Sequence, residues 1–258
     1  MRGIVKKFLP PASSAQGVIR TSSLAPATAS FTAATFLSKA ASSSSRDPAE
    51  HSHDHGSRSH GSRSVDEWRR ILEDPSRDGW QKPAQVVEAL GLRPGQDVAG
   101  IGAGTGYFSV RFAEAVGPGG KVFAVDIDQG LIDHLNERAK DAGLSNLQAV
   151  LAAPWLCALD DPLLSEKSLD IVFICDVIRH VQDRQGYFAK LSGTLRPGGR
   201  LAIVDFYKRE TPVGPPAAMK IAREDLISEL RKAGFVLARE FDFLPHQYFL
   251  VFEAIRGK

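Results

Sequence analysis

The stretch DVAGIGAGTGYFSV, residues 97–110, is the most informative part of the sequence, because four glycines occupy every second position behind a short apolar run. The apolar run predicts a β-strand, and the residues from about Thr105 onward predict a helix. In doubly wound sheets, the backbone N–H groups at the carboxyl end of such a strand point toward a ligand. The turn consists of small residues that let a ligand touch the main chain: Gly102, Ala103, Gly104, Thr105 and Gly106. The sequence therefore predicts a ligand site on this loop.

The spacing of the loop glycines distinguishes between classes of cofactor. The nicotinamide-dinucleotide fingerprint is G-x-G-x-x-G, and this stretch does not match it from either starting glycine. When the motif starts at Gly102 its third glycine falls on Tyr107, and when it starts at Gly104 it falls on Ser109. A nucleotide-dependent oxidoreductase is therefore disfavoured. The next apolar run, residues 121–127, carries Asp126 twenty residues past Gly106. A carboxylate there is positioned to accept hydrogen bonds from both hydroxyls of a ribose.

The segments around this loop alternate between strand and helix patterns. Apolar runs that predict strands lie at residues 97–101, 121–127, 147–151, 169–175 and 200–206. Amphipathic helices are predicted at residues 65–74, 83–91, 130–143 and 185–195, and Gly91 is the C-cap of the second. Strands that are apolar throughout belong in a parallel sheet covered on both faces. We therefore expect an α/β, doubly wound (Rossmann-like) domain over residues 65–258.

The last segments depart from this alternation. A predicted helix at residues 222–235 is followed by two strand-like stretches, residues 236–244 and 247–255, with only Pro245 and His246 between them. So short a link cannot hold a right-handed parallel crossover, and the two strands are expected to pair antiparallel. The prediction is a seven-stranded, mostly parallel sheet with an antiparallel last strand.

Residues 1–64 differ in composition from the domain predicted at 65–258. They carry eight Lys or Arg and three acids, which is a net charge of +5. Because the whole chain has a net charge of +2, residues 65–258 have a net charge of −3. A mildly acidic domain gives no electrostatic reason to bind nucleic acid. The first 46 residues contain no acid and are rich in Ser and Ala, which is typical of a transit peptide for the mitochondrion or another organelle. The alternatives are a degenerate secretory leader, implying a secreted or periplasmic protein, and a disordered tail.

Metal and membrane signals are weak in this sequence. The histidine-rich stretch 51–60 either binds a divalent ion loosely or is a solvated linker, because its Gly and Ser residues preorganise no coordination geometry. Cys157 and Cys175 lie in apolar surroundings that favour packed thiols, and no zinc spacing involves either. No apolar run reaches the roughly 18 to 20 residues of a membrane-spanning helix. We therefore expect no resident metal and no transmembrane segment.

Three segments together resemble the class I S-adenosylmethionine-dependent methyltransferases. GIGAGTGYFSVRFAEAVGPGGKVFAVDID (100–128) is similar to their glycine loop and acidic strand. LDIVFICDVIRHV (169–181) is similar to their fourth strand and its loop, and LRPGGRLAIVDF (195–206) to the turn into the fifth strand. The resemblance covers residues 66–258. It implies S-adenosylmethionine as the cofactor and transfer of its methyl group to a small-molecule acceptor.

The resemblance also implies roles for single residues. The three loop glycines line the methionine part of the cofactor, and Asp126 holds the ribose. Ile127 lies against the adenine, and Asp160 reaches the adenine amino group. Asp176, after the fourth predicted strand, either faces the cofactor or caps the next helix. His180 follows Asp176 at the same edge of the sheet.

His180 is the candidate catalytic residue. It serves as a base or orients the acceptor if the acceptor must lose a proton, whereas the competing interpretation is a helix-capping or partly packed histidine. Arg179 stands where related sequences often carry a second His. Asp205 either points into the acceptor pocket or makes a structural turn contact. The nearest branch of the family methylates quinones, lipids and arsenic, and the three cysteines expected for arsenic are absent.

Position 100 departs from the family pattern, which places Asp or Glu two residues before the first loop glycine to orient the cofactor's ammonium group. Here the residue is Gly100. One interpretation is a methyltransferase with weaker cofactor affinity, in which water or Asp176 replaces the carboxylate. Losing one charge-assisted hydrogen bond costs about 1.5 to 3 kcal/mol, or roughly 10- to 150-fold in affinity. The alternative is a catalytically decayed protein that binds a cofactor or a partner.

Overall fold

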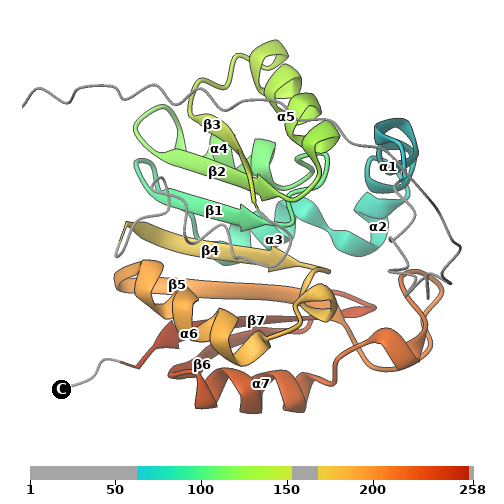
Figure 1. Cartoon of the computed structure of the whole chain (residues 1–258), viewed down its shortest axis with the longest axis vertical. Helices are drawn as coiled ribbons and strands as arrows, with labels where there is room; N and C mark the ends of the chain where they lie inside the picture. Colours follow the sequence, from blue (N-terminus) through green and yellow to red (C-terminus); the bar gives the residue numbers. More distant parts are fainter. Residues whose placement is uncertain (1–62, 153–167, 256–258) are drawn as a thin grey trace, which may run out of the picture. The chain divides into compact units, whose positions relative to one another are not determined.

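The computed structural model describes residues 63–152 and 168–255, which form a seven-stranded sheet with helices on both faces (Figure 1). The strands are β1 (Asp97–Ile101), β2 (Lys121–Asp126), β3 (Leu147–Leu151), β4 (Leu169–Cys175), β5 (Leu195–Phe206), β6 (Phe235–Phe241) and β7 (Gln247–Ala254). The helices are α1 (Val65–Leu72), α2 (Arg77–Gln81), α3 (Pro83–Leu90), α4 (Ser109–Val116), α5 (Gln129–Asp141), α6 (Arg184–Thr194) and α7 (Arg223–Lys232). The short 3₁₀ helices η3 (Ile178–His180) and η4 (Ala217–Met219) precede α6 and α7.

The strand order is β3-β2-β1-β4-β5-β7-β6. Strands β1 to β5 run parallel, and Gly100 of β1 lies between Ala124 of β2 and Phe173 of β4. β7 runs antiparallel to β5, pairing Tyr248 with Asp205, and β6 runs antiparallel to β7. The predicted sheet and its reversed last strand are therefore confirmed. The physical reason is the short link between β6 and β7, which only a hairpin can span.

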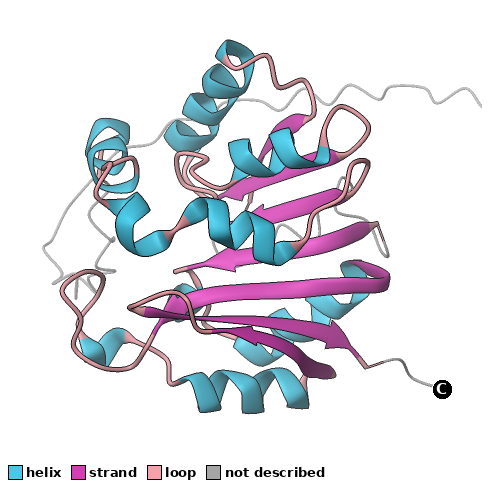
Figure 2. Ribbon diagram, turned by 180° about the vertical axis from the view of Figure 1, so that it is seen from behind, coloured by secondary structure: helices cyan, strands magenta, loops and turns pink. Residues whose placement is uncertain are grey.

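Both faces of the sheet are buried, which explains why its strands are apolar throughout. On β1, Val98 faces one side and packs in a core cluster with α3, α4 and α5, which includes Phe112 and Leu135. The neighbouring Ala99 belongs to the opposite cluster, together with Leu191 of α6 and residues of α7. Figure 2, which is the view from behind, shows α3 and α4 in front of the sheet. In Figure 1 the same two helices lie behind it. The carboxyl ends of the parallel strands therefore lie between two layers of helices.

Several elements differ from the sequence-based expectation, among them β5, which begins at Leu195 and not at Arg200. α4 begins at Ser109 and not near Thr105, because the three loop glycines hold a left-handed backbone that a right-handed helix cannot include. The short helix α2 is absent from the prediction, since five residues carry too little periodicity to indicate a helix. The predicted C-cap of α3 is confirmed, because Gly91 is left-handed with a φ of 59°.

Several sequence-based predictions fall on residues 1–62 and 153–167, which lie outside the described residues. These segments contain the predicted leader, the histidine-rich stretch and Asp160. Within the described residues, no helix has both the length and the apolar character needed to span a bilayer. In the same part of the chain, no group of three or more His, Cys, Asp or Glu side chains is arranged to hold a metal ion.

Candidate cofactor and acceptor site

The glycine loop connects the carboxyl end of β1 to α4. Gly102, Gly104 and Gly106 have φ angles of 67°, 57° and 86°, a left-handed conformation that residues with side chains rarely adopt. A Cβ atom would also lie 2.2 Å from a methyl group of Val177 at Gly102, and 2.8 Å from a methyl group of Leu72 at Gly104. Glycine is therefore required here by the backbone and by neighbouring side chains, in addition to the predicted approach of a ligand.

Asp126 closes this loop from the end of β2. Its Oδ2 accepts a hydrogen bond from the N–H of Gly104 at 2.8 Å, and its Oδ1 accepts from the N–H groups of Ile127 at 2.8 Å and Asp128 at 3.2 Å. Burial raises the pKa of the Asp126 carboxyl, although these hydrogen bonds act to lower it. Ile127, the predicted adenine contact, is 60% exposed beside it. The structure thus brings the predicted ribose carboxylate and the predicted glycine loop into direct contact.

The middle of the loop contains a polar group with no partner. The N–H of Ala103 donates to the carbonyl of Val125 at 2.9 Å, and the carbonyl of Thr105 accepts from Arg138 Nη1 at 2.8 Å. The Thr105 side chain is buried, and among the described residues its Oγ1 has no hydrogen-bond partner. Buried hydroxyls normally find a partner. An unpartnered hydroxyl within the glycine loop is consistent with a polar ligand such as S-adenosylmethionine at this loop.

Helices α1 and α2 cover the loop, an arrangement that the sequence analysis did not predict. Leu72, the last residue of α1, packs on the loop. The guanidinium of Arg77 in α2 lies 4.0 Å from the ring centroid of Tyr107, and its Nη1 donates to the carbonyl of Leu72 at 2.9 Å. Glu73, next to α1, forms an ion pair with Arg138 of α5 at 2.9 Å. The N-terminal helices therefore hold the loop in place from outside the sheet.

A buried polar network lies where β4 ends and β7 begins. Asp176 has a left-handed φ of 60°, and its Oδ1 accepts a hydrogen bond from Gln247 Nε2 at 2.7 Å. Gln247 Oε1 in turn accepts from Gln81 Nε2 at 2.7 Å. Burial raises the pKa of the Asp176 carboxyl, and the charge of Arg77 opposes this. Asp183 provides the side-chain cap of α6, so the capping alternative for Asp176 is wrong.

Asp205 is the residue to which the sequence analysis gave too little weight. It is 1% exposed, its Oδ1 accepts from the N–H of Phe206 at 2.7 Å, and its Oδ2 has no partner among the described residues. Burial and then the charge of Asp176 raise the pKa of Asp205 to about 7, against the cations Arg179 and Lys220. Such a carboxyl can exchange a proton near neutral pH. The signal in the sequence was a lone acid at the end of an apolar strand.

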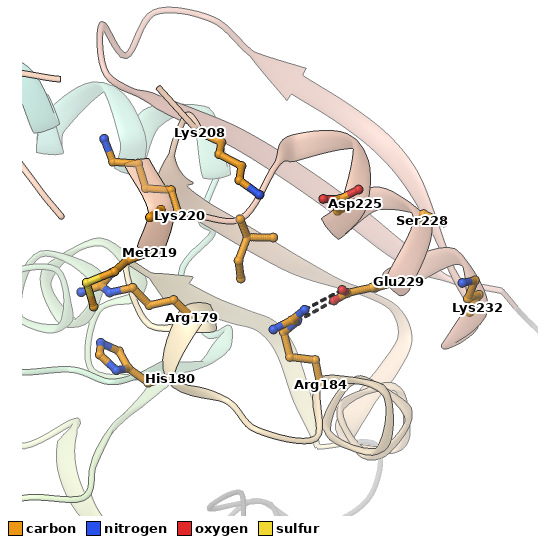
Figure 3. Close-up of a pocket in the computed structure, with 12 residues that line it drawn as sticks. Arg179, His180, Arg184, Lys208, Met219, Lys220, Asp225, Ser228, Glu229 and Lys232 are labelled. Atoms are coloured by element: carbon orange, nitrogen blue, oxygen red, sulfur yellow. Dashed lines mark hydrogen bonds and ion pairs between the residues drawn. The ribbon is translucent and has the colours of Figure 1, made fainter. Parts of the chain in front are cut away.

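His180 lines a cavity of about 580 Å³ between η3, α7 and the connection from β5 to α7 (Figure 3). The polar side chains around it include Arg179, His180, Arg184, Lys208, Lys220 and Glu229. His180 is exposed at the end of η3. The residues that line the cavity come from the carboxyl edge of β4 and β5 and from α7, not from the glycine loop. The structure thus separates His180 from the loop while keeping both at the same edge of the sheet.

Gly100 differs from the loop glycines in its surroundings. It is buried in β1, and its backbone is not left-handed. An added Cβ atom would lie 3.4 Å from the hydroxyl oxygen of Ser109, at the near limit of ordinary van der Waals contact. The position therefore has room for the first atom of a side chain, which the loop glycines lack.

Comparisons with known proteins point to one family. A family model described as a methyltransferase domain matches residues 92–237. The ubiquinone/menaquinone biosynthesis C-methyltransferase UbiE of Ectopseudomonas mendocina is 32% identical over 129 residues, 50% of this chain and 48% of that protein. The protein of the same name from Vibrio vulnificus is 31% identical over 159 residues, 61% of this chain and 57% of that protein. The chain thus spans about half the length of the curated relatives it matches.

The fold is also found in solved structures. A SAM dependent methyltransferase from Aquifex aeolicus superimposes with a TM-score of 0.67, at 23% sequence identity, over 74% of this chain and 98% of that one. At this level of identity the likeness concerns the fold.

Proposed function

Because this chain belongs to the methyltransferase-domain family, we propose that it transfers a methyl group from S-adenosylmethionine to a small-molecule acceptor. The observation that carries the proposal is the contact between the glycine loop after β1 and the carboxylate after β2, through the 2.8 Å hydrogen bond from Gly104 to Asp126. The family resemblance and the cofactor class predicted from the sequence agree with this membership. A nicotinamide-dependent oxidoreductase has no support from the family or from the loop spacing.

The residues of the loop have distinct roles in this proposal. S-adenosylmethionine, when bound, supplies a methyl group that is already activated on a sulfonium, so the protein mainly orients the reactants, an effect worth roughly 7 to 11 kcal/mol. The loop from Gly102 to Gly106 holds the amino-acid part of the cofactor. Asp126 accepts hydrogen bonds from the ribose hydroxyls, and Ile127 covers the adenine. Asp176 provides a carboxylate for the ammonium group at the neighbouring strand end.

The acceptor is proposed to bind in the cavity beside His180. A volume of about 580 Å³ suits a small molecule, since pockets for such ligands range over roughly 300 to 1,000 Å³. His180 orients the acceptor or takes its proton, and Asp205 is a second proton acceptor at the same edge. The matched relatives are named for ubiquinone and menaquinone biosynthesis and for C-methylation. A quinol with an unsubstituted ring carbon is the acceptor that these names suggest, and in an activity assay it is the neutral comparison for the anionic acceptor inferred below.

Gly100 supports a finer proposal about cofactor affinity. The position has room for a Cβ atom, yet it lacks the carboxylate that the family pattern places there. We therefore propose an active site with weaker affinity for S-adenosylmethionine. A decayed protein that binds the cofactor without transferring its methyl group is the second candidate, and it rests on the same glycine.

Isothermal titration calorimetry with S-adenosylmethionine tests the cofactor proposal. We expect saturable binding to the parent chain, and Asp126→Ala should weaken it by about 2 kcal/mol or more, because the ribose hydroxyls lose their acceptor. Asp126→Asn keeps the shape of the side chain but has one acceptor oxygen, so it loses either the bond from the Gly104 N–H or the bonds from the Ile127 and Asp128 N–H groups. Thermal denaturation of both variants therefore separates a lost ribose acceptor from a weakened loop. Asp133→Ala, at an exposed position of α5, is the matched control.

Two results would contradict the cofactor proposal. One is unchanged affinity in both Asp126 variants. The other is saturable binding of NAD by a parent chain that does not bind S-adenosylmethionine.

A further inference from the structure

The cavity beside His180 carries more positive than negative charge. Five of the side chains that line it are cations, namely Arg179, Arg184, Lys208, Lys220 and Lys232, and two are acids, Asp225 and Glu229. The predicted domain around it has a net charge of −3. A surplus of cations in one cavity of a mildly acidic domain is therefore a local feature, and such a cavity attracts anions.

Internal ion pairs account for only part of this charge. Arg184 donates two hydrogen bonds of 2.6 Å to the carboxylate of Glu229, and these two side chains neutralise each other (Figure 3). Arg179, Lys208 and Lys220 form no ion pair with any described residue. Lys232 has no such partner either, so four of the five cations of the cavity have no carboxylate partner in the described part of the chain.

Lys220 is the least exposed of these cations. It is 3% exposed, and its Nζ donates to the carbonyl of Arg209 at 2.7 Å and to Thr211 Oγ1 at 2.6 Å. An ammonium group has three protons, and the Phe206 ring, whose centroid is 5.3 Å from Nζ, lies near the group as well. The charge of Lys220 acts on the buried Asp205, but no carboxylate of the described residues pairs with it, and an anionic ligand in the cavity would add to its stabilisation.

Arg179 connects the cavity to the edge where the methyl group is transferred. It lies three residues after Asp176, and its Nη1 donates to the Asp176 carbonyl at 2.6 Å. Its Nε is buried and has no hydrogen-bond partner among the described residues. Figure 3 shows Arg179 and His180 at one end of the cavity, with Lys208 and Lys220 across from them. A ligand in the cavity thus lies between cations and the end of β4.

We propose that the acceptor is a small, soluble anion whose carboxylate or phosphate group is held by Arg179, Lys208 and Lys220. This inference rests on the proposed methyltransferase function and specifies the chemical class of its acceptor. The guanidinium of Arg179 offers a planar pair of donors, and the two lysines offer point charges, a combination that suits carboxylate and phosphate oxygens.

Calorimetric titration of the full chain with benzoate and with inorganic phosphate tests this inference. Benzamide, which has the shape of benzoate without its charge, is the matched neutral probe. We expect benzoate to bind saturably and benzamide to bind at least about tenfold more weakly, because a charge-assisted hydrogen bond is lost. Lys208→Gln should weaken benzoate binding by about tenfold, since Lys208 is exposed and its loss leaves the fold intact. Lys140→Gln, an exposed lysine on α5, should have no effect.

Each outcome bears on either the acceptor class or the methyltransferase function. Equal binding of benzoate and benzamide, or equal benzoate binding by the parent and Lys208→Gln, would overturn the anionic acceptor. Binding to phosphatidylglycerol vesicles without binding to benzoate or phosphate would overturn a soluble acceptor in favour of a lipid headgroup. Titration of the same samples with S-adenosylmethionine tests the function separately, because failure to bind it leaves the benzoate result intact.

Discussion

Gly100 is a buried residue whose backbone does not require glycine. Gly100→Asp should tighten S-adenosylmethionine binding by about 1.5 to 3 kcal/mol, because a carboxylate there faces the cofactor's ammonium group. Calorimetry measures this change. Gly100→Asn, which has nearly the same shape without the charge, should not reproduce the gain. Gly104→Asp should abolish binding, since its left-handed backbone and the nearby Leu72 exclude a side chain.

The opposite result at position 100 is equally informative. If Gly100→Asp binds S-adenosylmethionine more weakly than the parent while circular dichroism shows an intact fold, the pocket is built around the glycine. The proposal of a weakened site would then be wrong.

Asp205 makes a second prediction at this scale, on the pH dependence of stability. In the unfolded chain an Asp ionises near pH 4, whereas in the folded protein burial and Asp176 raise the pKa of Asp205 to about 7. The folded state therefore holds more protons between pH 4 and 7, and the free energy of unfolding falls as pH rises through this window. Asp205→Asn cannot ionise, so its stability relative to the parent should rise between pH 5 and pH 8 by about 2 to 3 kcal/mol, the part of the shift that falls between pH 5 and 7.

Urea denaturation at the two pH values measures this difference. Asp133→Asn, at an exposed position, is the control. A stability difference between Asp205→Asn and the parent that is the same at pH 5 and pH 8 would show that Asp205 does not titrate in this window.

At the scale of elements, the turn between β1 and α4 requires glycine for two reasons. Gly102 has a φ of 67°, and a Cβ atom there would lie 2.2 Å from Val177, which follows β4. Gly102→Ala should therefore destabilise the fold by roughly 1 to 3 kcal/mol, from the left-handed backbone and the displaced valine. Gly100→Ala, only two residues away on the strand, should be tolerated, because it meets neither obstacle.

Thermal or urea denaturation of the two alanine variants gives the comparison. Equal losses of stability in Gly100→Ala and Gly102→Ala would contradict this prediction, because the strand and the turn would then tolerate a Cβ atom equally. Gly102→Ala is also expected to shift the chain between β4 and η3, because Val177 lies in that segment and must move away from the added Cβ atom.

At the scale of the whole molecule, residues 1–62 are expected to be dispensable for folding, since their sequence has neither hydrophobic periodicity nor enough apolar surface to offset ordering. A chain beginning at Arg63 keeps the capping box of α1, in which Ser64 and Glu67 exchange hydrogen bonds. It should unfold cooperatively at nearly the melting temperature of the full chain. A large decrease would show that the leader packs on the domain.

The predicted import into an organelle remains a proposal at this scale. Its basis is the acid-free, Ser- and Ala-rich composition of the first 46 residues. Fluorescence microscopy of the full chain and of the chain beginning at Arg63, each fused to a reporter at the carboxyl terminus, tests it. Identical distributions of the two fusions would contradict a targeting role.

The α/β class, the glycine loop and the reversal of the last strand could be predicted from the sequence. Each of these follows from local signals, because apolar periodicity, glycine spacing and link length act over a few neighbouring residues. The position of Asp126 beside the loop belongs to the same group, since parallel strands place their carboxyl ends at one edge.

Contacts between segments that lie far apart in the sequence became visible in the folded chain alone. Gln81 and Asp176 bind the two ends of Gln247, and Arg77 lies over Tyr107. Burial and then the charge of Asp176 raise the pKa of Asp205, and although a lone acid in an apolar strand hints at the burial, no pattern within the fifth strand indicates Asp176 as a neighbour. The cationic cavity likewise forms only when α7 and the segment after β5 pack against η3. The physical reason is that these contacts depend on how helices pack on the sheet, and local periodicity does not encode this packing.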